Sequence, residues 1–440
     1  RLRELRIGEL AVVPAFEVGY QQLTTAQRTA FRLLGVVEAA EIGLPAAAAV
    51  VGLPAAEAEA VLESLVDVAM LESPGEHRYR HHSLLRDFAR AVGGADPAER
   101  TGEEILARTR LLTFLLAGAC AAFEAAVPGD PIRDTLGGGR GYEGSPTFAS
   151  SSEARAWARA EAGTVAGLAG QIAAQASARV EGYQALVPTA VDLLIAMSPF
   201  GPGPWARKTS AAVKELGRAA AVGEDGRAQG RAWFLAGNAA LAAGRLDEAE
   251  RFGRRALETC REAGDPVIVR QVLNDLGVIA HARGAYEEAA GLFGEAVELA
   301  RELGHRAGET GSLLNRAVSR LRAGQAAQVL ADCEAMSGAG AQVSYVSGLA
   351  LVALERPREA AHRFAAAAVE WGAEGVADRA ARARFQQAKA LHALGADDEA
   401  REHAKAALAG FEAEGLVGDQ RAVRTWLDEL DETRGGVPTA

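Results

Sequence analysis

The fold of this chain is decided by residues 231–260, which read RAWFLAGNAALAAGRLDEAERFGRRALETC. Here a small residue, Gly237, is followed after seven residues by Gly244 and after five more by Ala249. The pattern recurs, with anchors at Gly237, Gly277, Ala317, Gly348 and Ala388, loop positions at Gly244, Gly284, Gly324, Glu355 and Gly395, and later positions at Ala249, Ala289, Val329, Ala360 and Ala400. The anchors are separated by 40, 40, 31 and 40 residues. This periodicity predicts a mainly α-helical solenoid, in which each helix pair buries its apolar face against its neighbours.

Two of these units resemble the tetratricopeptide repeat (TPR). The matching residues are Trp233, Gly237, Gly244, Ala249 and Ala256 in the first unit and Gly277, Gly284, Tyr286, Ala289, Phe293 and Ala296 in the second. We count about five TPR-like repeats within residues 223–440, and we expect a capping helix at residues 420–433 to close the array. The resemblance implies a superhelical array that binds a partner and catalyses no reaction.

The inner surface of such an array is lined by the first helix of each pair, so polar residues there are candidate ligand-binding groups. The candidates are Arg231, Phe234, Asn238, Asn274, His281, Asn315, Arg322, Tyr345, Lys389 and His392. Amides and cations at successive levels can hold the backbone or the terminal carboxylate of an extended peptide. The alternative is that each asparagine satisfies a local backbone group or faces water.

The first ninety residues follow a different plan. A capping-box pattern at Thr24–Gln27 predicts the start of a first helix, and Pro45 and Pro54 mark the starts of two more. Residues 70–80, with a Pro-Gly turn, predict a β-hairpin. These elements predict a winged-helix domain over residues 1–92, whose residues 1–15 are the remnant of a preceding helical segment. Residues 93–222 are expected to form a helical bundle with a flexible loop at 127–149.

A second resemblance starts from residues 78–91, RYRHHSLLRDFARA, which look like the segment closing the winged-helix domain of STAND-class (NB-ARC) signalling ATPases. His82 matches the histidine that, in that family, contacts the β-phosphate of bound ADP. Ser83 replaces the usual aspartate, and we expect its hydroxyl to cap the next helix. Together with residues 16–36, 65–73 and 152–173, this segment makes the chain resemble the C-terminal part of AfsR-like regulators, in the actinobacterial antibiotic regulatory protein (SARP) group.

The sequence offers little support for chemistry in this chain. A P-loop requires Gly-x-x-x-x-Gly-Lys-Ser/Thr, and the nearest stretch, residues 201–209, has prolines and an arginine where glycine and backbone donors are needed. Residues 139–144 spell Gly-x-Gly-x-x-Gly, but without flanking strand and helix we expect a loop. His77, His81 and His82 lack further ligands at zinc spacing. We therefore expect no catalytic residue, metal or cofactor here, with ATP or ADP implied only for an upstream domain.

Composition limits the partners and the location. The chain has 47 Lys and Arg against 58 Asp and Glu, a net charge of −11, which disfavours nonspecific DNA binding. Its three cysteines, Cys120, Cys260 and Cys333, are far apart in sequence, as expected in a reducing cytoplasm. The longest apolar run, Leu111–Phe123, is shorter than the ~20 residues that a bilayer requires, so we expect a buried helix and no membrane partner. The chain begins RLRELRIGEL without methionine, and we expect further residues upstream.

Three functions remain open at this point. In the leading one, the array binds a protein, a peptide or a small-molecule signal and controls an upstream ATPase and DNA-binding region. The second is a passive interaction scaffold. The third is DNA binding by the winged helix itself, through the helix at residues 54–69. That helix carries Glu57, Glu59, Glu63 and Asp67 and no Lys or Arg, so phosphate repulsion argues against it.

Overall fold

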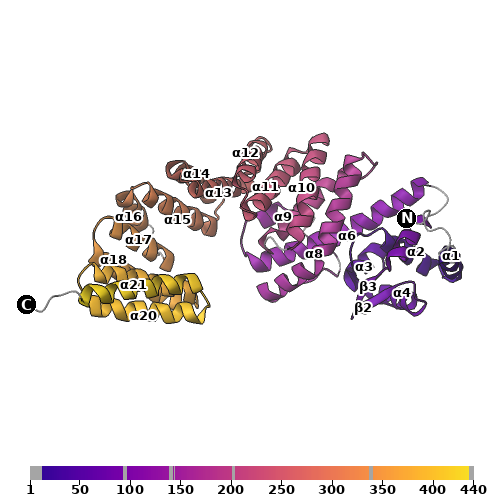
Figure 1. Ribbon diagram of the computed structural model, residues 1–440. Coiled ribbons are helices and arrows are strands. Elements are labelled where there is room, and N and C mark those ends of the chain that lie inside the picture. The colour runs from indigo at the N-terminus through magenta and orange to yellow at the C-terminus, as the bar shows by residue number, and fades with distance from the viewer. Residues whose placement is uncertain are drawn as a thin grey trace, which may run out of the picture. The chain divides into compact units, whose positions relative to one another are not determined.

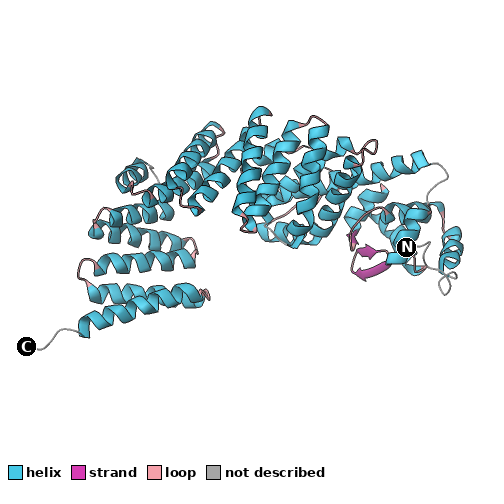
Figure 2. Cartoon of the chain, turned by 45° about the horizontal axis from the view of Figure 1, so that its top comes forward, coloured by secondary structure: helices cyan, strands magenta, loops and turns pink. Residues whose placement is uncertain are grey.

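A computed structural model describes residues 12–92, 97–137, 142, 144–200, 204–335 and 340–435. Within these ranges the chain is mainly helical, as predicted, with α-helices α1 to α21 and three short strands (Figures 1 and 2). The backbone divides into two compact units, Arg1–Asp275 and Leu276–Ala440. Each unit is described by itself below.

The first unit begins with five helices and a small sheet. The elements are α1 (Val12–Gln22), α2 (Thr25–Gly35), β1 (Ile42–Gly43), α3 (Leu44–Val51), α4 (Ala55–Asp67), β2 (Glu72–Gly75), β3 (Arg78–Arg80) and α5 (Ser83–Ala91). The antiparallel sheet has the order β1-β3-β2, with Ile42 opposite Tyr79. The three expected helices and the hairpin are therefore present, whereas β1 was not predicted.

The starts of α2 and α5 differ in whether a side chain caps the helix. The capping box at α2 is confirmed, because the Gln27 amide N–H donates to Thr24 Oγ1 (3.3 Å) and the Thr24 amide donates to Gln27 Oε1 (2.8 Å). The prediction that Ser83 caps α5 is wrong. Ser83 is the first helical residue, and the capping position belongs to His82, whose side chain makes no capping bond.

The core of this segment is built around Phe31, which is fully buried. Its ring packs against Tyr20, Phe88 and His81, with centroid separations of 5.9, 6.3 and 4.9 Å. His81 is itself buried, and this burial, with the Arg86 guanidinium nearby, lowers the pKa of its imidazole to about 3. His81 is therefore a neutral core residue at physiological pH.

The rest of the first unit is a helical bundle joined to the first repeat. Its helices are α6 (Pro97–Ala126), α7 (Ile132–Thr135), α8 (Ser151–Ser177), α9 (Val187–Met197), α10 (Pro204–Val222), α11 (Gly226–Ala242), α12 (Leu246–Glu262) and α13 (Pro266–Ala282), the last of which ends in the second unit. Helix α6 packs against α8 and α9, and α11 packs against α9, α10 and α12. The run Leu111–Phe123 lies in α6 and is mostly buried, as expected.

One described helix has the length and composition to cross a membrane, namely Arg100–Ala126 within α6. However, 67% of its apolar window is buried inside the protein. A core helix of this length passes the same test, so the observation does not indicate a membrane span.

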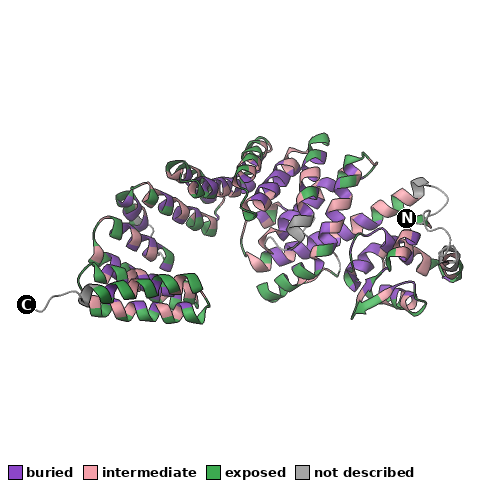
Figure 3. Ribbon diagram, in the orientation of Figure 1, coloured by how far each residue is buried: buried purple, intermediate pink, exposed green. Residues whose placement is uncertain are grey.

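The second unit continues the repeats. Its helices are α14 (Tyr286–Glu302), α15 (Arg306–Arg322), α16 (Ala326–Ala335), α17 (Ala341–Ala353), α18 (Pro357–Ala373), α19 (Ala377–His392), α20 (Asp397–Ala413) and α21 (Val417–Gly435). Helix α21 packs on α20, where the capping helix was predicted, and extends slightly beyond the expected bounds. Figure 3 shows the alternation of buried and exposed faces along these helices.

The anchor positions explain why the repeat needs small residues. A Cβ atom added at Gly277 would lie 2.7 Å from the Phe293 ring, and one added at Gly348 would lie 2.6 Å from the Phe364 ring. Both rings are buried on the second helix of the pair. At Gly237 the nearest atoms would be at least 3.6 Å away, because Gly253 stands where the second and fourth pairs have phenylalanine. The two helices thus approach over a small residue, as predicted.

All five loop positions adopt the left-handed backbone conformation, which explains the recurrence of glycine there. The φ angles are +70° at Gly244, +80° at Gly284, +79° at Gly324 and +74° at Gly395. Glu355 occupies the fourth position with φ +55°, although a side chain disfavours that region. The repeat therefore keeps its turn geometry where the glycine is missing.

Candidate binding surface

The ten candidate groove residues differ in how far they are buried. The structure buries two of them, leaves five half-buried and exposes three. Arg231 and Phe234 are 0% and 4% exposed. Asn238, Asn274, His281, Asn315 and Tyr345 are half-buried, and Arg322, Lys389 and His392 are exposed. The assignment of Arg231 and Phe234 to an open groove is therefore wrong, because a ligand cannot reach either side chain in this structure.

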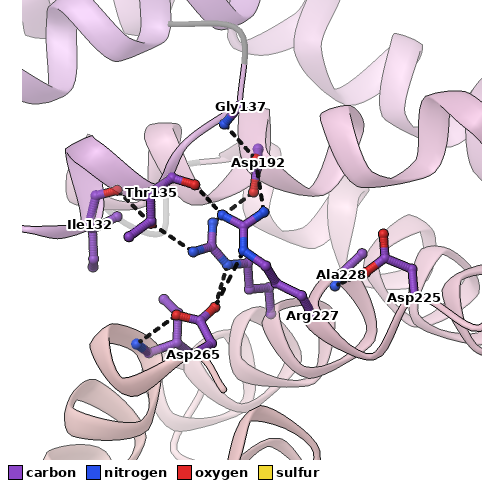
Figure 4. A network of polar contacts seen from close by, with 10 residues as sticks. Ile132, Thr135, Gly137, Asp192, Asp225, Arg227, Ala228 and Asp265 are labelled. Carbon is purple, nitrogen blue, oxygen red and sulfur yellow. Dashed lines mark hydrogen bonds and ion pairs between the residues drawn. The ribbon is translucent and has the colours of Figure 1, made fainter. Parts of the chain in front are cut away.

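Arg231 is held in a buried polar network, and Figure 4 labels its neighbours Thr135, Asp192, Arg227 and Asp265. Its Nη1 donates to Asp192 Oδ1, its Nε donates to Asp265 Oδ2, and its Nη2 donates to Thr135 Oγ1, all at 2.7 Å. Burial alone would lower the pKa of the guanidinium, but the bonds to Asp265 and Asp192 outweigh it and raise that pKa. Arg231 on α11 thus joins the first repeat to α7 and α9 of the bundle and to the residue that precedes α13.

Further contacts complete this network. The Gly137 amide donates to Asp192 Oδ2 (2.8 Å), and Arg227 lies beside both carboxylates while donating to the Thr135 carbonyl. Each carboxylate therefore has a cation and hydrogen-bond donors, which is what a buried ion pair needs to be tolerated. We name these five side chains, Thr135, Asp192, Arg227, Arg231 and Asp265, the arginine anchor.

Two of the half-buried candidates, Asn274 and His281, have partners within the protein. Asn274 hydrogen-bonds the side chain of its neighbour Asp275. His281 Nδ1 lies 2.9 Å from Ser319 Oγ, and its ring meets the edge of Tyr286. Asn274 and His281 thus already have partners within the protein, while part of each side chain stays accessible.

Tyr345 belongs mainly to the core between repeats. Its ring packs against Phe364 (5.5 Å) and Trp371 (5.4 Å), and its side chain hydrogen-bonds Gln386 of α19. Burial raises the pKa of its phenol, while the bond to Gln386 opposes that rise. Tyr345 therefore has a mainly structural role, because it connects the first helices of the fourth and fifth repeats.

The exposed candidates lie in the second unit. Arg322 ends α15, and Lys389 near the end of α19 holds its Nζ 4.2 Å from the centroid of the Phe385 ring. Partial burial lowers the pKa of Lys389. His392 Nδ1 lies 2.7 Å from Asp397 Oδ1, and its ring contacts Trp426. Of the ten candidates, Arg322 and Lys389 are the cations best placed to meet a partner.

The two histidines before α5 differ in exposure. His81 is buried in the core, whereas the adjacent His82 is exposed. An outside group, such as a nucleotide held by another domain, can therefore contact only His82 of this pair.

The described residues offer no assembled reaction centre. No three of their His, Cys, Asp or Glu side chains lie together as metal ligands. The cysteines are free and buried, and burial raises the pKa of Cys120 to about 11 and that of Cys260 to about 12, so both are poor nucleophiles. Of the Gly-x-Gly-x-x-Gly spelling at 139–144 only Tyr142 and Gly144 are described, and residues 201–203, the start of the 201–209 stretch, lie outside the described residues.

Comparison with known proteins places this geometry in a family context. A tetratricopeptide-repeat family profile matches residues 228–302. The regulatory protein AfsR of Streptomyces coelicolor is 35% identical over 335 residues, covering 75% of this chain and 32% of the relative. The AfsR of Streptomyces griseus is 34% identical over 363 residues, covering 82% and 36%. The chain thus spans about a third of the length of these relatives.

Solved structures show distant likeness. A STAND protein with a tetratricopeptide-repeat sensor from Pyrococcus horikoshii is 18% identical with a TM-score of 0.27, covering 96% of this chain and 66% of that one. The apo quorum sensor NprR of B. thuringiensis is 12% identical with a TM-score of 0.42, covering 55% and 68%. The sequence matches carry the conclusion: this chain is related over most of its length to the AfsR regulatory proteins, and it carries tetratricopeptide repeats.

Proposed function

We propose that this chain is the signal-receiving and self-regulating part of a larger STAND-type transcriptional regulator. The observation that carries this proposal is the sequence match to AfsR regulatory proteins. The match covers 75–82% of this chain but only 32–36% of the relatives. In the proposal, an ATPase domain and a DNA-binding region lie upstream, and the repeats bind a protein, peptide or small-molecule signal in the cytoplasm. The chain alone is expected neither to hydrolyse ATP nor to bind it tightly.

We also propose that residues 12–92 act as a winged-helix domain that contacts protein instead of DNA. Three helices followed by the β2–β3 hairpin support the fold. Helix α4 would be the DNA-reading helix, but its Glu63 accepts a bond from the Tyr79 hydroxyl (2.6 Å) and its Glu59 lies 3.1 Å from His77 Nδ1. A helix with this acidic surface repels phosphates, so the role of the domain is better sought at the upstream ATPase.

Hydrogen bonds between this domain and the bundle support the idea of regulation. The backbone at the end of α2 accepts hydrogen bonds from one side chain of the domain's own α5 and from two side chains of the bundle. Arg90 of α5 donates to the Gly35 carbonyl (2.8 Å), while Arg108 of α6 and Gln171 of α8 donate to the Val36 carbonyl (3.2 and 2.6 Å). Arg108 and Gln171 bond directly to the backbone of the domain. We therefore expect the domain and the bundle to move together.

The arginine anchor extends this connection to the first repeat. Hydrogen bonds to the domain's backbone on one side of the bundle, and the arginine anchor on the other, make the first unit a candidate two-state element, which an upstream domain and the repeats can both influence. A signal shifts such an equilibrium only by its difference in affinity for the two arrangements, and a change from 1:99 to 99:1 needs about 5.5 kcal/mol. The proposal therefore requires the repeats to bind the signal more tightly in the active arrangement.

The test uses the full-length regulator and two histidine variants. His82→Ala should increase the rate of ADP release and the basal output of a reporter gene, because the proposed contact to the β-phosphate is lost. His77→Ala, an exposed histidine on the hairpin, is the matched control and should leave both unchanged. Fluorescent ADP displacement measures the first quantity. Identical ADP release from both variants and the parent protein would remove the proposed link to the ATPase.

A further inference from the structure

Charge is divided unevenly between the two sets of helices in the second unit. The first helices of its repeats, α15, α17 and α19, carry eight Lys and Arg against two Asp and Glu, a net charge of +6. The second helices, α14, α16, α18 and α20, carry five Lys and Arg against fourteen Asp and Glu, a net charge of −9. In a chain of net charge −11, cations are thus concentrated on one set of helices.

The first helices form a continuous layer. His281 at the end of α13 meets Ser319 of α15 (2.9 Å), residues of α15 and α17 share one apolar cluster, and Tyr345 of α17 bonds Gln386 of α19. Each first helix also packs against its own second helix through the small anchor residue. The accessible sides of the two sets therefore belong to different surfaces, with opposite charge.

Ion pairs neutralise only some of the cations on the first helices. Arg316 and Arg320 pair with Asp332 of α16, and Arg382 lies 3.4 Å from Asp419. Within the described part of the chain, Arg322 and Lys389 have no carboxylate partner. An exposed cation without a partner keeps its full attraction for an incoming carboxylate.

The same side of these helices carries a row of apolar residues. Val278, Val318 and Leu349 directly follow the anchors Gly277, Ala317 and Gly348, and Lys389 follows the anchor Ala388. Val278 and Val318 are 37% and 36% exposed, and Leu349 is half-buried. Arg322 lies four residues after Val318 and so shares its helix face. We call Val278, Val318, Arg322, Leu349 and Lys389 the first-helix surface.

We propose that the first-helix surface binds an extended protein segment rich in Asp and Glu that also carries spaced apolar side chains. Its carboxylates would meet Arg322 and Lys389, and its apolar groups would cover Val278, Val318 and Leu349. This inference rests on the proposed function, because it names the class of partner that the repeats receive. The apolar row favours a protein segment over a nucleic acid, whose backbone offers no apolar side chains to cover it.

The test measures binding of the whole chain to three fluorescein-labelled peptides by fluorescence anisotropy. Each peptide has about ten residues, enough to span roughly 33 Å when extended. One alternates Leu and Glu, one alternates Leu and Lys, and one alternates Ser and Glu. The Leu-Glu peptide should bind at least about ten-fold more tightly than either of the others, because only it satisfies both the cations and the apolar row.

Charge reversal on the surface supplies the matched comparison. The double variant Arg322→Glu, Lys389→Glu should weaken binding of the Leu-Glu peptide by about ten-fold or more. The control double variant Arg358→Glu, Lys405→Glu makes the same charge change at exposed sites on the second helices and should alter binding by less than about two-fold. Circular dichroism of both variants should match that of the parent chain.

Three outcomes would overturn the inference. They are equal binding of the Leu-Lys peptide, equal weakening by the control variant, and tighter binding of single-stranded DNA than of the Leu-Glu peptide. None of these outcomes touches the histidine test described above. If His82→Ala speeds ADP release while the Leu-Glu peptide fails to bind, the partner class is wrong and the regulatory role stands.

Discussion

Arg231 in the first repeat and Arg382 in the fifth occupy the same repeat position, six residues before the anchors Gly237 and Ala388. Arg231 is fully buried between Asp192 and Asp265, at 2.7 Å from each. The Arg382 side chain is 51% exposed and has one ion pair of 3.4 Å. The difference arises from the neighbours, because α7 and α9 contribute Thr135 and Asp192 around Arg231, whereas Arg382 meets Asp419 of α21 at an exposed site. A position in a repeat therefore does not decide whether a residue can meet a ligand.

The largest expected effect comes from replacing Arg231, the buried arginine of the two. Arg231→Ala should lower the free energy of unfolding by about 3–5 kcal/mol, because Asp192 and Asp265 are left buried without their cation. Arg382→Ala, at the same repeat position, should cost about 0–1 kcal/mol. Urea denaturation followed by circular dichroism measures both. Equal losses from the two variants would contradict the contrast.

The anchors provide a second comparison between the units. Gly348→Ala should destabilise the chain by about 1–3 kcal/mol, because the added Cβ would lie 2.6 Å from the buried Phe364 ring. Gly237→Ala in the first repeat should be neutral or stabilising by about 0.5–1 kcal/mol, since its nearest neighbours are 3.6 Å away and alanine favours the helix. Thermal unfolding of both variants checks the order. A Gly237→Ala variant as damaged as Gly348→Ala would disprove this account of the anchors.

Burial of His81 predicts an acid sensitivity confined to the first unit. The imidazole has a pKa of about 3 when folded, below its ordinary value of 6.5, so the unfolded chain binds a proton more readily in acid. Stability is therefore retained above pH 6.5 and falls as the pH drops, by about 2 kcal/mol at pH 5. The free energy of unfolding of the variant His81→Gln should depend less on pH than that of the parent chain, as measured by urea titrations at pH 5 and above pH 6.5. His82→Gln, at the exposed neighbour, is the control and should keep the parental slope.

The smallest expected effect concerns the repeat loop that lacks glycine. Glu355→Gly should stabilise the second unit by about 0.5–1 kcal/mol, because Glu355 holds φ at +55° without the freedom of glycine. The reverse exchange, Gly395→Ala in the next repeat, should cost a similar amount, since that residue has φ +74°. Differential scanning calorimetry resolves such changes. A loss of stability on Glu355→Gly would show that the Glu355 side chain contributes more than the turn conformation costs.

Features encoded by local spacing could be predicted from the sequence. The anchors, the loop positions and the α2 capping box depend on residues within one helix pair or one turn, so their pattern is visible along the chain. The burial of Arg231 could not be predicted in this way, since it depends on Asp192, 39 residues earlier, and on Thr135, 96 residues earlier. The roles predicted for Phe234 and Ser83 were wrong for related reasons. A match to a family motif does not show which elements cover Phe234, nor that α5 begins at Ser83 and not after it.

The contrast between a covered first repeat and an accessible second unit can be tested most directly by hydrogen–deuterium exchange of the whole chain, with and without the Leu-Glu peptide. The account predicts that the peptide slows amide exchange in α15, α17 and α19 and leaves α11 unchanged. Slower exchange in α11, or no change in the three first helices while the peptide is bound, would contradict it.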